Sequence, residues 1–114
     1  MSRHDPMTRV RHMLDHAQEA RDMAVDRQRS DLDTDRQFEL SLVRLMEIVG
    51  EAASRVPPEF RQQYPDVPWR DISDFRNRLI HGYDEVDLDV LWKIITDELD
   101  PLIQDLEAII RDHH

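Results

Sequence analysis

The sequence contains no cysteine, which excludes a disulfide framework, a thiolate nucleophile and a cysteine-ligated zinc site. Only two glycines occur among 114 residues, and the large share of Leu, Ile, Arg, Glu and Asp indicates helices joined by short turns. No apolar run approaches the length of a membrane span, about 18 residues, and the opening MSRHDPMTRV lacks the apolar stretch of a secretory signal. We therefore expect a soluble, cytoplasmic protein that does not associate with membranes.

Lysine is almost absent as well, because fourteen of the fifteen cationic residues are arginines. The formal net charge is −10, which argues against non-specific binding of nucleic acid. An enzyme that acts on a phosphate, however, needs positive potential only where that phosphate is bound. Arginine is also the residue best suited to planar, bidentate phosphate contacts.

Apolar residues recur at helical spacing in four long segments, and no segment shows the two-residue alternation of a strand. The pair Asp5-Pro6 is typical of a helix start, and we expect this first helix to run to about residue 28. The second helix is predicted to be capped by Asp33 or Thr34 and to end at the sequence VPP. A single helical turn is possible in the following loop, PPEFRQQYPDVP.

The third long helix is predicted to begin at Pro68 and to stop at Gly82, because glycine accepts a left-handed backbone conformation. Asp87 is a plausible cap for the last helix, in which Pro101 should produce a kink. Gly50 lies off the apolar stripe of the second helix, where its missing side chain would permit another helix to approach closely.

These elements predict one domain over residues 1–114, an all-α antiparallel bundle of four long helices with a possible short one. The last helix is apolar over an unusually wide arc. We therefore expect a second face of that helix to be buried in a homodimer. The residues outside its main stripe are Leu91, Ile94, Ile103 and Ile110.

The stretch RNRLIHGY, residues 76–83, concentrates the candidate chemistry. On an ideal helix Arg76 and His81, five residues apart, diverge by about 140°, whereas Asn77 and His81 share a face. A histidine transfers protons near neutral pH, and an arginine binds a phosphate through two parallel hydrogen bonds. A helix end at Gly82 would place His81 where the helix dipole favours the protonated ring.

Two interpretations follow from these residues alone. An arginine and a histidine at the polar end of a helix are commonly solvated, or paired with nearby carboxylates such as Asp71 and Asp74. The same pair without metal ligands also fits transesterification of RNA, in which the substrate supplies its own 2′-hydroxyl nucleophile.

The octapeptide resembles the R-x4-H-x-Y motif of HepT-like toxins, which belong to the HEPN superfamily of all-α ribonucleases. The stretch MEIVGEAASRVPPEF is similar to the second-helix segment of that family, with its Gly-Glu-Ala core. Residues 64–103, beginning YPDVPWRD, resemble the family pattern from the Pro-Trp helix start through the last helix. The resemblance covers roughly residues 7–110, and it is most specific over residues 65–83.

This resemblance implies a metal-independent endoribonuclease without a cofactor, acting on tRNA or other cellular RNA as the toxin of a toxin–antitoxin pair. Arg76 and His81 would be the catalytic pair, with Asn77 as the supporting polar residue, and two such pairs would meet at a dimer interface. Tyr83 matches the tyrosine that a minimal nucleotidyltransferase antitoxin modifies with AMP. That modification would neutralise the enzyme by placing phosphate charge beside Arg76.

Two carboxylates and two arginines are further candidates. Glu47 and Glu51 lie four residues apart on the second helix, and the resemblance makes Glu51 a supporting residue for Arg76 or His81. Arg70 and Arg78 flank the motif and are candidates for contacting the RNA backbone. The alternative for Arg70 and Arg78 is pairing with the neighbouring Asp74 and Asp71, and the alternative for the two glutamates is a solvated or arginine-paired side chain.

Other chemistry-bearing residues are better explained by structure. His12 and His16 have chelating spacing, but HMLDH lacks the glutamate of a zinc protease, so we expect exposed side chains and no metal. Trp69, Trp92 and Tyr64 are aromatic side chains of the kind that stacks on bases, and we read the two tryptophans as packing residues. The alternative function is a non-catalytic helical adaptor that binds a nucleotidyltransferase, an interpretation that the acidic balance favours.

Overall fold

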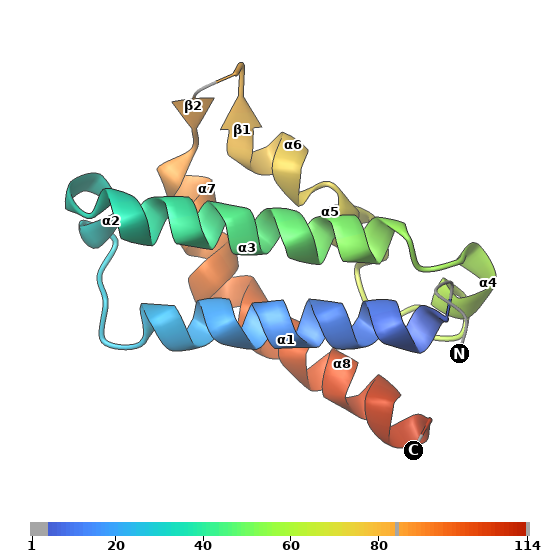
Figure 1. The fold of residues 1–114 in the computed structure, drawn as a ribbon. Coiled ribbons are helices and arrows are strands. Elements are labelled where there is room, and N and C mark those ends of the chain that lie inside the picture. The colour runs from blue at the N-terminus through green and yellow to red at the C-terminus, as the bar shows by residue number, and fades with distance from the viewer. Residues whose placement is uncertain (1–4, 84, 114) are drawn as a thin grey trace.

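The computed structural model describes residues 5–83 and 85–113, and almost all of its regular structure is helical (Figure 1). The all-α class is thus confirmed except for one pair of two-residue strands. In chain order the elements are α1 (Pro6–Ala24), α2 (Asp31–Thr34), α3 (Arg36–Ser54), α4 (Pro58–Arg61), α5 (Trp69–Ser73), α6 (Phe75–Leu79), β1 (Ile80–His81), β2 (Glu85–Val86), α7 (Leu88–Lys93), the π-helical segment η1 (Ile94–Glu98) and α8 (Leu99–Asp112).

The first helix begins where the sequence predicts. The Asp5 carboxylate accepts a hydrogen bond from the backbone N–H of Met7 (2.9 Å), and Pro6 occupies the first turn. The helix ends at Ala24, earlier than the predicted residue 28, and Asp26 then adopts a positive φ of 61°. The connection that follows contains the short helix α2, which the sequence analysis did not predict.

The second long helix is capped by Asp35, so the predicted caps Asp33 and Thr34 were wrong. Asp35 accepts from the backbone N–H of Phe38 (3.0 Å). Arg27 also donates to Asp35 (2.8 Å), which joins this helix start to the preceding loop. Asp33 and Thr34 instead lie within α2. The single helical turn expected in the next loop is present as α4.

The third predicted long helix is the main departure from expectation. It is divided into α5 and α6, of five residues each, and it ends at Leu79 rather than Gly82. Ile80 then turns to an extended backbone (φ −110°, ψ 119°), and the next residues pair as an antiparallel hairpin, with Ile80 opposite Val86. The expectation that strands are absent was therefore wrong at this point.

Gly50 has the packing role that its position predicts. A Cβ atom built on Gly50 would lie 2.9 Å from the backbone oxygen of Ile72 and 3.6 Å from the Cβ of Phe75. Only glycine accommodates so close an approach without a shift of the backbone. The segment α5–α6 is thereby seated directly on α3.

The last helical stretch starts as predicted, since Asp87 accepts from the backbone N–H of Val90 (3.1 Å). A π-helical segment, η1, interrupts this stretch and ends three residues before Pro101. The kink predicted at Pro101 stays a prediction.

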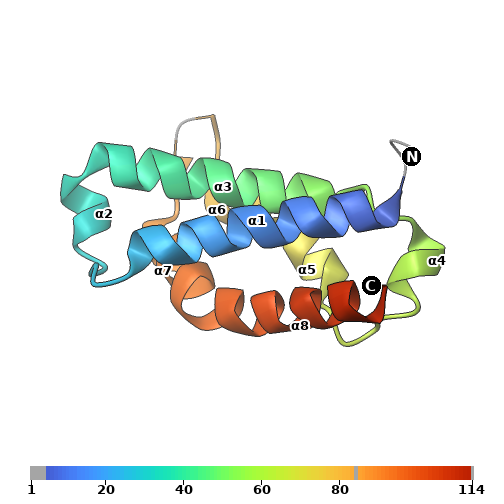
Figure 2. The same ribbon diagram turned by 60° about the horizontal axis from the view of Figure 1, so that its bottom comes forward.

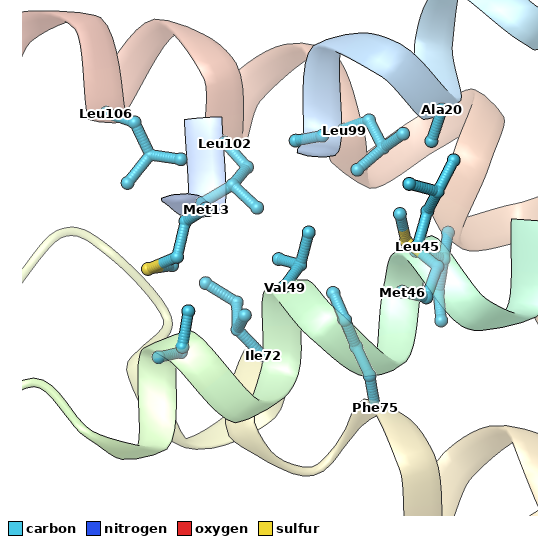
Figure 3. Close-up of a cluster of buried hydrophobic side chains, with 14 of the residues drawn as sticks. Met13, Ala20, Leu45, Met46, Val49, Ile72, Phe75, Leu99, Leu102 and Leu106 are labelled. Atoms are coloured by element: carbon cyan, nitrogen blue, oxygen red, sulfur yellow. The ribbon is translucent and has the colours of Figure 1, made fainter. Parts of the chain in front are cut away.

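Three long helical stretches enclose the core. Helix α1 packs between α3 and α8, and the β1–β2 hairpin projects from the opposite side of α3 (Figures 1 and 2). Apolar side chains from α1, α3, α5, α6 and α8 point toward one another between these elements (Figure 3). The described part of the chain contains no helix with both the length and the apolar character needed to cross a bilayer.

The wide apolar arc of the last helix is largely covered within one chain. Leu91 and Ile94 have no exposed surface, and Ile103 is 2% exposed, while Ile110 is partly buried against the same core. The observation from which we predicted a homodimer is therefore explained by intramolecular packing. The homodimer itself stays a prediction.

Candidate active site

The motif residues 76–83 span the end of α6, strand β1 and the hairpin turn. Arg76 and Asn77 lie on α6, and His81 lies on β1, where it is paired with Glu85. His81 is therefore not on a helical turn, and the predicted influence of a helix dipole on its ring loses its basis. Gly82 has the predicted left-handed backbone (φ 76°), but it uses it to turn the hairpin.

Arg76 presents an open guanidinium. Its side chain is 71% exposed, and Nη1 donates to Oε2 of Glu47 at 3.4 Å, which is a long contact. Glu47 on α3 is the less exposed partner, at 21%. Around these two side chains lies a surface hollow that is lined by Arg44, Glu47, Gly50, Glu51, Ser54, Ser73 and Arg76.

His81 faces a different carboxylate. Its Nε2 atom lies 3.6 Å from Oδ2 of Asp87, too far for a hydrogen bond but close enough for an ion pair when the ring is protonated. The His81 side chain is 56% exposed and Asp87 is 35% exposed. Asp87 also caps α7, so its carboxylate is held by the backbone N–H of Val90.

Within one chain the structure does not join the two predicted catalytic side chains. No hydrogen bond or ion pair connects Arg76 with His81 in the described part of the chain. Each is paired instead with its own carboxylate, Glu47 for the arginine and Asp87 for the histidine. Both contacts were missed by the sequence analysis, because they depend on how α3 and the hairpin pack.

Glu51 does not support Arg76 or His81 by direct contact. Its carboxylate accepts from Arg55 at 2.9 Å, one turn further along α3. Glu51 nevertheless lines the same hollow as Arg76. The prediction selected Glu51 rather than Glu47, whereas the position of α6 places Arg76 beside Glu47.

Asn77 and Arg78, the other polar residues of α6 in the motif, each have a carboxylate partner. Asn77 on α6 donates to Asp74, the residue immediately before that helix, at 2.6 Å. Arg78 forms a bidentate pair with Glu98 of η1, at 3.0 and 2.7 Å. Hydrogen bonds to Glu98 raise the pKa of the Arg78 guanidinium, and the pair fastens α6 to the last helical stretch.

The two predicted RNA-contacting arginines therefore differ. Arg78 is partly buried and held by Glu98, rather than by the Asp71 or Asp74 that we considered as its partners. Arg70 is exposed and lines a second hollow with Arg61, Ser73 and Asp74. Of the pair, only Arg70 presents a guanidinium for which the structure shows no salt bridge among the described residues.

Tyr83 is fully exposed in the hairpin turn, two residues after His81. Its side chain helps to line a hollow between the hairpin and the start of α3. The other residues of this hollow are Arg36, Glu39, Leu40, Ile80, Val86 and Leu88.

The two tryptophans have the expected packing roles. Trp69 is buried and donates from Nε1 to the backbone oxygen of Tyr64 at 3.0 Å. Trp92 is partly buried against the core. The ring of Tyr64 packs against Phe60, with centroids 5.3 Å apart, and against His113 at 5.9 Å.

The histidine pair on α1 forms no chelate in this structure. Nδ1 of His16 lies 2.7 Å from the backbone oxygen of His12, and the two rings meet edge to face, with centroids 6.4 Å apart. No cluster of three or more potential metal-ligating side chains occurs among residues 5–83 and 85–113.

Comparison with known proteins gives this geometry a context. The family model described as "Ribonuclease HepT-like" matches residues 13–109. The "Probable ribonuclease HepT" of Thermococcus cleftensis is 37% identical over 68 residues, which are 60% of this chain and 62% of that protein. The "Putative RNase MJ0127" of Methanocaldococcus jannaschii is 32% identical over 78 residues, 68% of this chain and 64% of that protein.

A third relative matches over its full length. The "Putative RNase MJ1380" of Methanocaldococcus jannaschii is 28% identical over 109 residues, 96% of this chain and 100% of that protein. With the first two relatives, by contrast, the match spans less than two thirds of the relative's length. No solved structure matches the chain. The family match covers most of the sequence, so the chain belongs to the Ribonuclease HepT-like family.

Proposed function

We propose that this protein is a metal-independent endoribonuclease of the HEPN type in which Arg76 and His81 carry the chemistry. The observation that supports this most directly is the exposure of both side chains, each beside a carboxylate of its own, in a chain of this family. The names of the relatives describe ribonucleases, which agrees with this reading of the site.

Arg76 binds the scissile phosphate in this proposal. A guanidinium holds two phosphate oxygens through parallel hydrogen bonds and stabilises the negative charge of the transition state. Glu47 contacts Arg76 in the free protein, but at 3.4 Å and with an arginine 71% exposed this ion pair is weak. An incoming phosphate therefore displaces the Glu47 carboxylate at little energetic cost.

His81 transfers the proton. The 2′-oxygen of the RNA attacks the adjacent phosphorus, the bond to the 5′-oxygen breaks, and the products are a 2′,3′-cyclic phosphate and a 5′-hydroxyl. An imidazole is able to accept the proton of the 2′-hydroxyl or to donate one to the leaving 5′-oxygen. Asp87, 3.6 Å from Nε2, acts as a positioning residue that holds the ring.

The reaction has two proton transfers, and one chain supplies one His81. Because Arg76 and His81 do not contact each other within a chain, we propose that a homodimer brings the pair of one copy beside that of the other. Asn77 supports the site through its contact with Asp74. Arg70 contacts the RNA backbone, and Arg78 contributes there only when its pair with Glu98 opens.

We further propose a cytoplasmic toxin that is controlled by a minimal nucleotidyltransferase antitoxin, with tRNA as a substrate. Tyr83 is the proposed AMP acceptor, and its complete exposure in a turn leaves the phenol accessible to such an enzyme. The Tyr83 oxygen would attack the α-phosphorus of ATP and release pyrophosphate. The added phosphate charge then lies two residues from His81 and competes with RNA for Arg76.

The test is tRNA cleavage by the purified protein in EDTA, with analysis of the fragment ends. We expect 2′,3′-cyclic phosphate ends from the unmodified protein and none from His81→Ala. His16→Ala is a matched control, because it removes a histidine that lies on α1 and lines none of the hollows described above. Equal cleavage by His81→Ala and the unmodified protein would refute the assignment.

The second candidate, a non-catalytic adaptor for a nucleotidyltransferase, is favoured by the net charge of −10. Expression without a partner protein distinguishes the two functions. Growth arrest that His81→Ala relieves supports the ribonuclease. If the protein is harmless and its intact mass shows no AMP on Tyr83, the adaptor is the better description.

A further inference from the structure

Arg44 on α3 is a cation that the motif does not include. Its side chain is exposed, and it makes no salt bridge or side-chain hydrogen bond with the residues that the structure describes. It belongs to the lining of the Arg76 hollow, together with Glu47 and Glu51. Both of these glutamates already have arginine partners, Arg76 and Arg55.

Arg44 also lines a second hollow, between α1 and α3. The residues of this second hollow are Arg9, His12, Arg44, Ile48, Glu51, Ala52 and Arg55. The two hollows share Arg44 and Glu51, so they adjoin along the surface of α3. Arg44 thus stands at the boundary between the proposed catalytic site and a neighbouring depression.

The charge of this surface is opposite to that of the whole protein. The two hollows together are lined by four arginines and two glutamates, whereas the chain carries a net charge of −10. The positive residues also form an elongated group, since Arg44 and Arg55 are separated by about 16 Å along the helix axis. A local positive strip on an acidic protein attracts a polyanion to that part of the surface.

We propose that Arg44 is an RNA-binding residue, and that the RNA backbone runs from the Arg76 hollow across Arg44 into the hollow lined by Arg9, His12 and Arg55. This inference rests on the proposed ribonuclease function. It adds a binding residue outside the motif, and it explains how an acidic protein holds RNA at one place. Arg44 donates through an unoccupied guanidinium, whereas Arg76 must first release Glu47.

The test measures RNA binding by fluorescence anisotropy over a range of NaCl concentrations. The probe is a fluorescein-labelled, mixed-sequence single-stranded RNA, and all proteins carry His81→Ala so that the probe stays intact. Arg44→Gln is compared with Arg111→Gln, which removes the same charge from an exposed position on α8 that lines neither hollow. Arg44→Lys tests whether a positive charge without the planar, bidentate guanidinium is sufficient for RNA binding.

We expect Arg44→Gln to weaken binding roughly tenfold at low salt, as for the loss of one charge-assisted contact. The slope of log Kd against log salt should also fall by about 0.7. Arg111→Gln should change neither value, and Arg44→Lys should keep the slope while it loses part of the affinity. If Arg44→Gln and Arg111→Gln are indistinguishable, the inference is wrong.

Two further measurements separate the possible failures. If the unmodified protein cleaves RNA but Arg44→Gln binds the probe normally, the ribonuclease proposal is supported and the proposed role of Arg44 is wrong. If the protein neither cleaves nor binds any RNA tested, both proposals fall together. Sedimentation of the free variant completes the test, because a change of mass with Arg44→Gln would assign Arg44 to an interface between copies and overturn the inference.

Discussion

Replacing Gly50 by alanine tests whether the close contact between α3 and α5 holds Arg76 in its place in the candidate site. The alanine Cβ would lie 2.9 Å from the carbonyl oxygen of Ile72, closer than real Cβ contacts. Because that atom belongs to the backbone, no rotamer change relieves the overlap, and α5 must move away from α3. Ile72 and Phe75, which are 2% and 1% exposed, would then lose packing.

Two opposing terms set the magnitude. Alanine is favoured over glycine inside a helix by about 1 kcal/mol. Overpacking of a dense core typically costs about 1–3 kcal/mol. We therefore expect Gly50→Ala to lower the free energy of unfolding by about 1 kcal/mol in net terms. We also expect it to slow RNA cleavage, because α6 carries Arg76 away from its place beside Glu47.

Urea unfolding followed by circular dichroism measures the stability term, and the second glycine supplies the control. Gly82 has open space around it but a φ of 76°, so its restriction is conformational. Asparagine tolerates a left-handed backbone better than alanine does. Gly82→Asn should therefore be more stable than Gly82→Ala, whereas Gly50→Asn should be less stable than Gly50→Ala.

The reasoning fails if Gly50→Ala is more stable than the unmodified protein by the full helix-propensity gain. That result, with RNA cleavage unchanged, would mean that α5 does not approach α3 as closely as Gly50 and Ile72 indicate.

Three further predictions concern charged groups. Hydrogen bonds from Arg27 and from the helix N-terminus lower the pKa of Asp35 from its ordinary value of 3.8, so the unfolded chain binds protons more readily than the folded one. The contribution of Asp35 to the free energy of unfolding is complete above that ordinary pKa and is lost as the pH falls through the lower pKa of the folded protein. Asp35→Asn removes this titrating group, so its free energy of unfolding should fall less steeply as the pH is lowered. Glu98→Gln, which breaks the bidentate pair with Arg78, should lower the free energy of unfolding by about 1 kcal/mol in a urea titration, and an unchanged midpoint would contradict the anchoring role. Asp87→Asn keeps a capping side chain for α7 but removes the carboxylate beside His81, so kcat for RNA cleavage should fall roughly tenfold with unfolding almost unchanged.

Local chemistry made several features predictable from the sequence. Asp5-Pro6 and Asp87 cap the helices that follow them, because a short acidic side chain bonds the nearest free N–H groups without help from the rest of the fold. The role of Gly50 was also predictable, since a glycine in an otherwise regular amphipathic helix indicates the close approach of another helix. The family was predicted from the resemblance of the octapeptide and its surroundings to a known pattern, and the family match confirms it.

Features that depend on tertiary contacts were not predictable in this way. The apolar arc of the last helix looks the same in the sequence whether it is covered by a partner or, as here, by the rest of the chain. Spacing alone likewise does not distinguish Glu47 from Glu51. The packing of α6 on α3 places Arg76 beside Glu47, whereas Glu51 forms its ion pair with Arg55.

The sequence by itself determined the helical class and the caps of the first and last helical stretches, because these follow from local periodicity and capping. The family and the candidate residues followed from the resemblance of the motif and its surroundings to a known pattern. Tertiary structure alone decided that the motif leaves its helix at Leu79, that His81 lies in a hairpin opposite Glu85, and that its ring faces Asp87. The apolar residues at the end of α6 suit a helix and a strand equally well. The choice between them was made by pairing with residues 85–86, further along the chain.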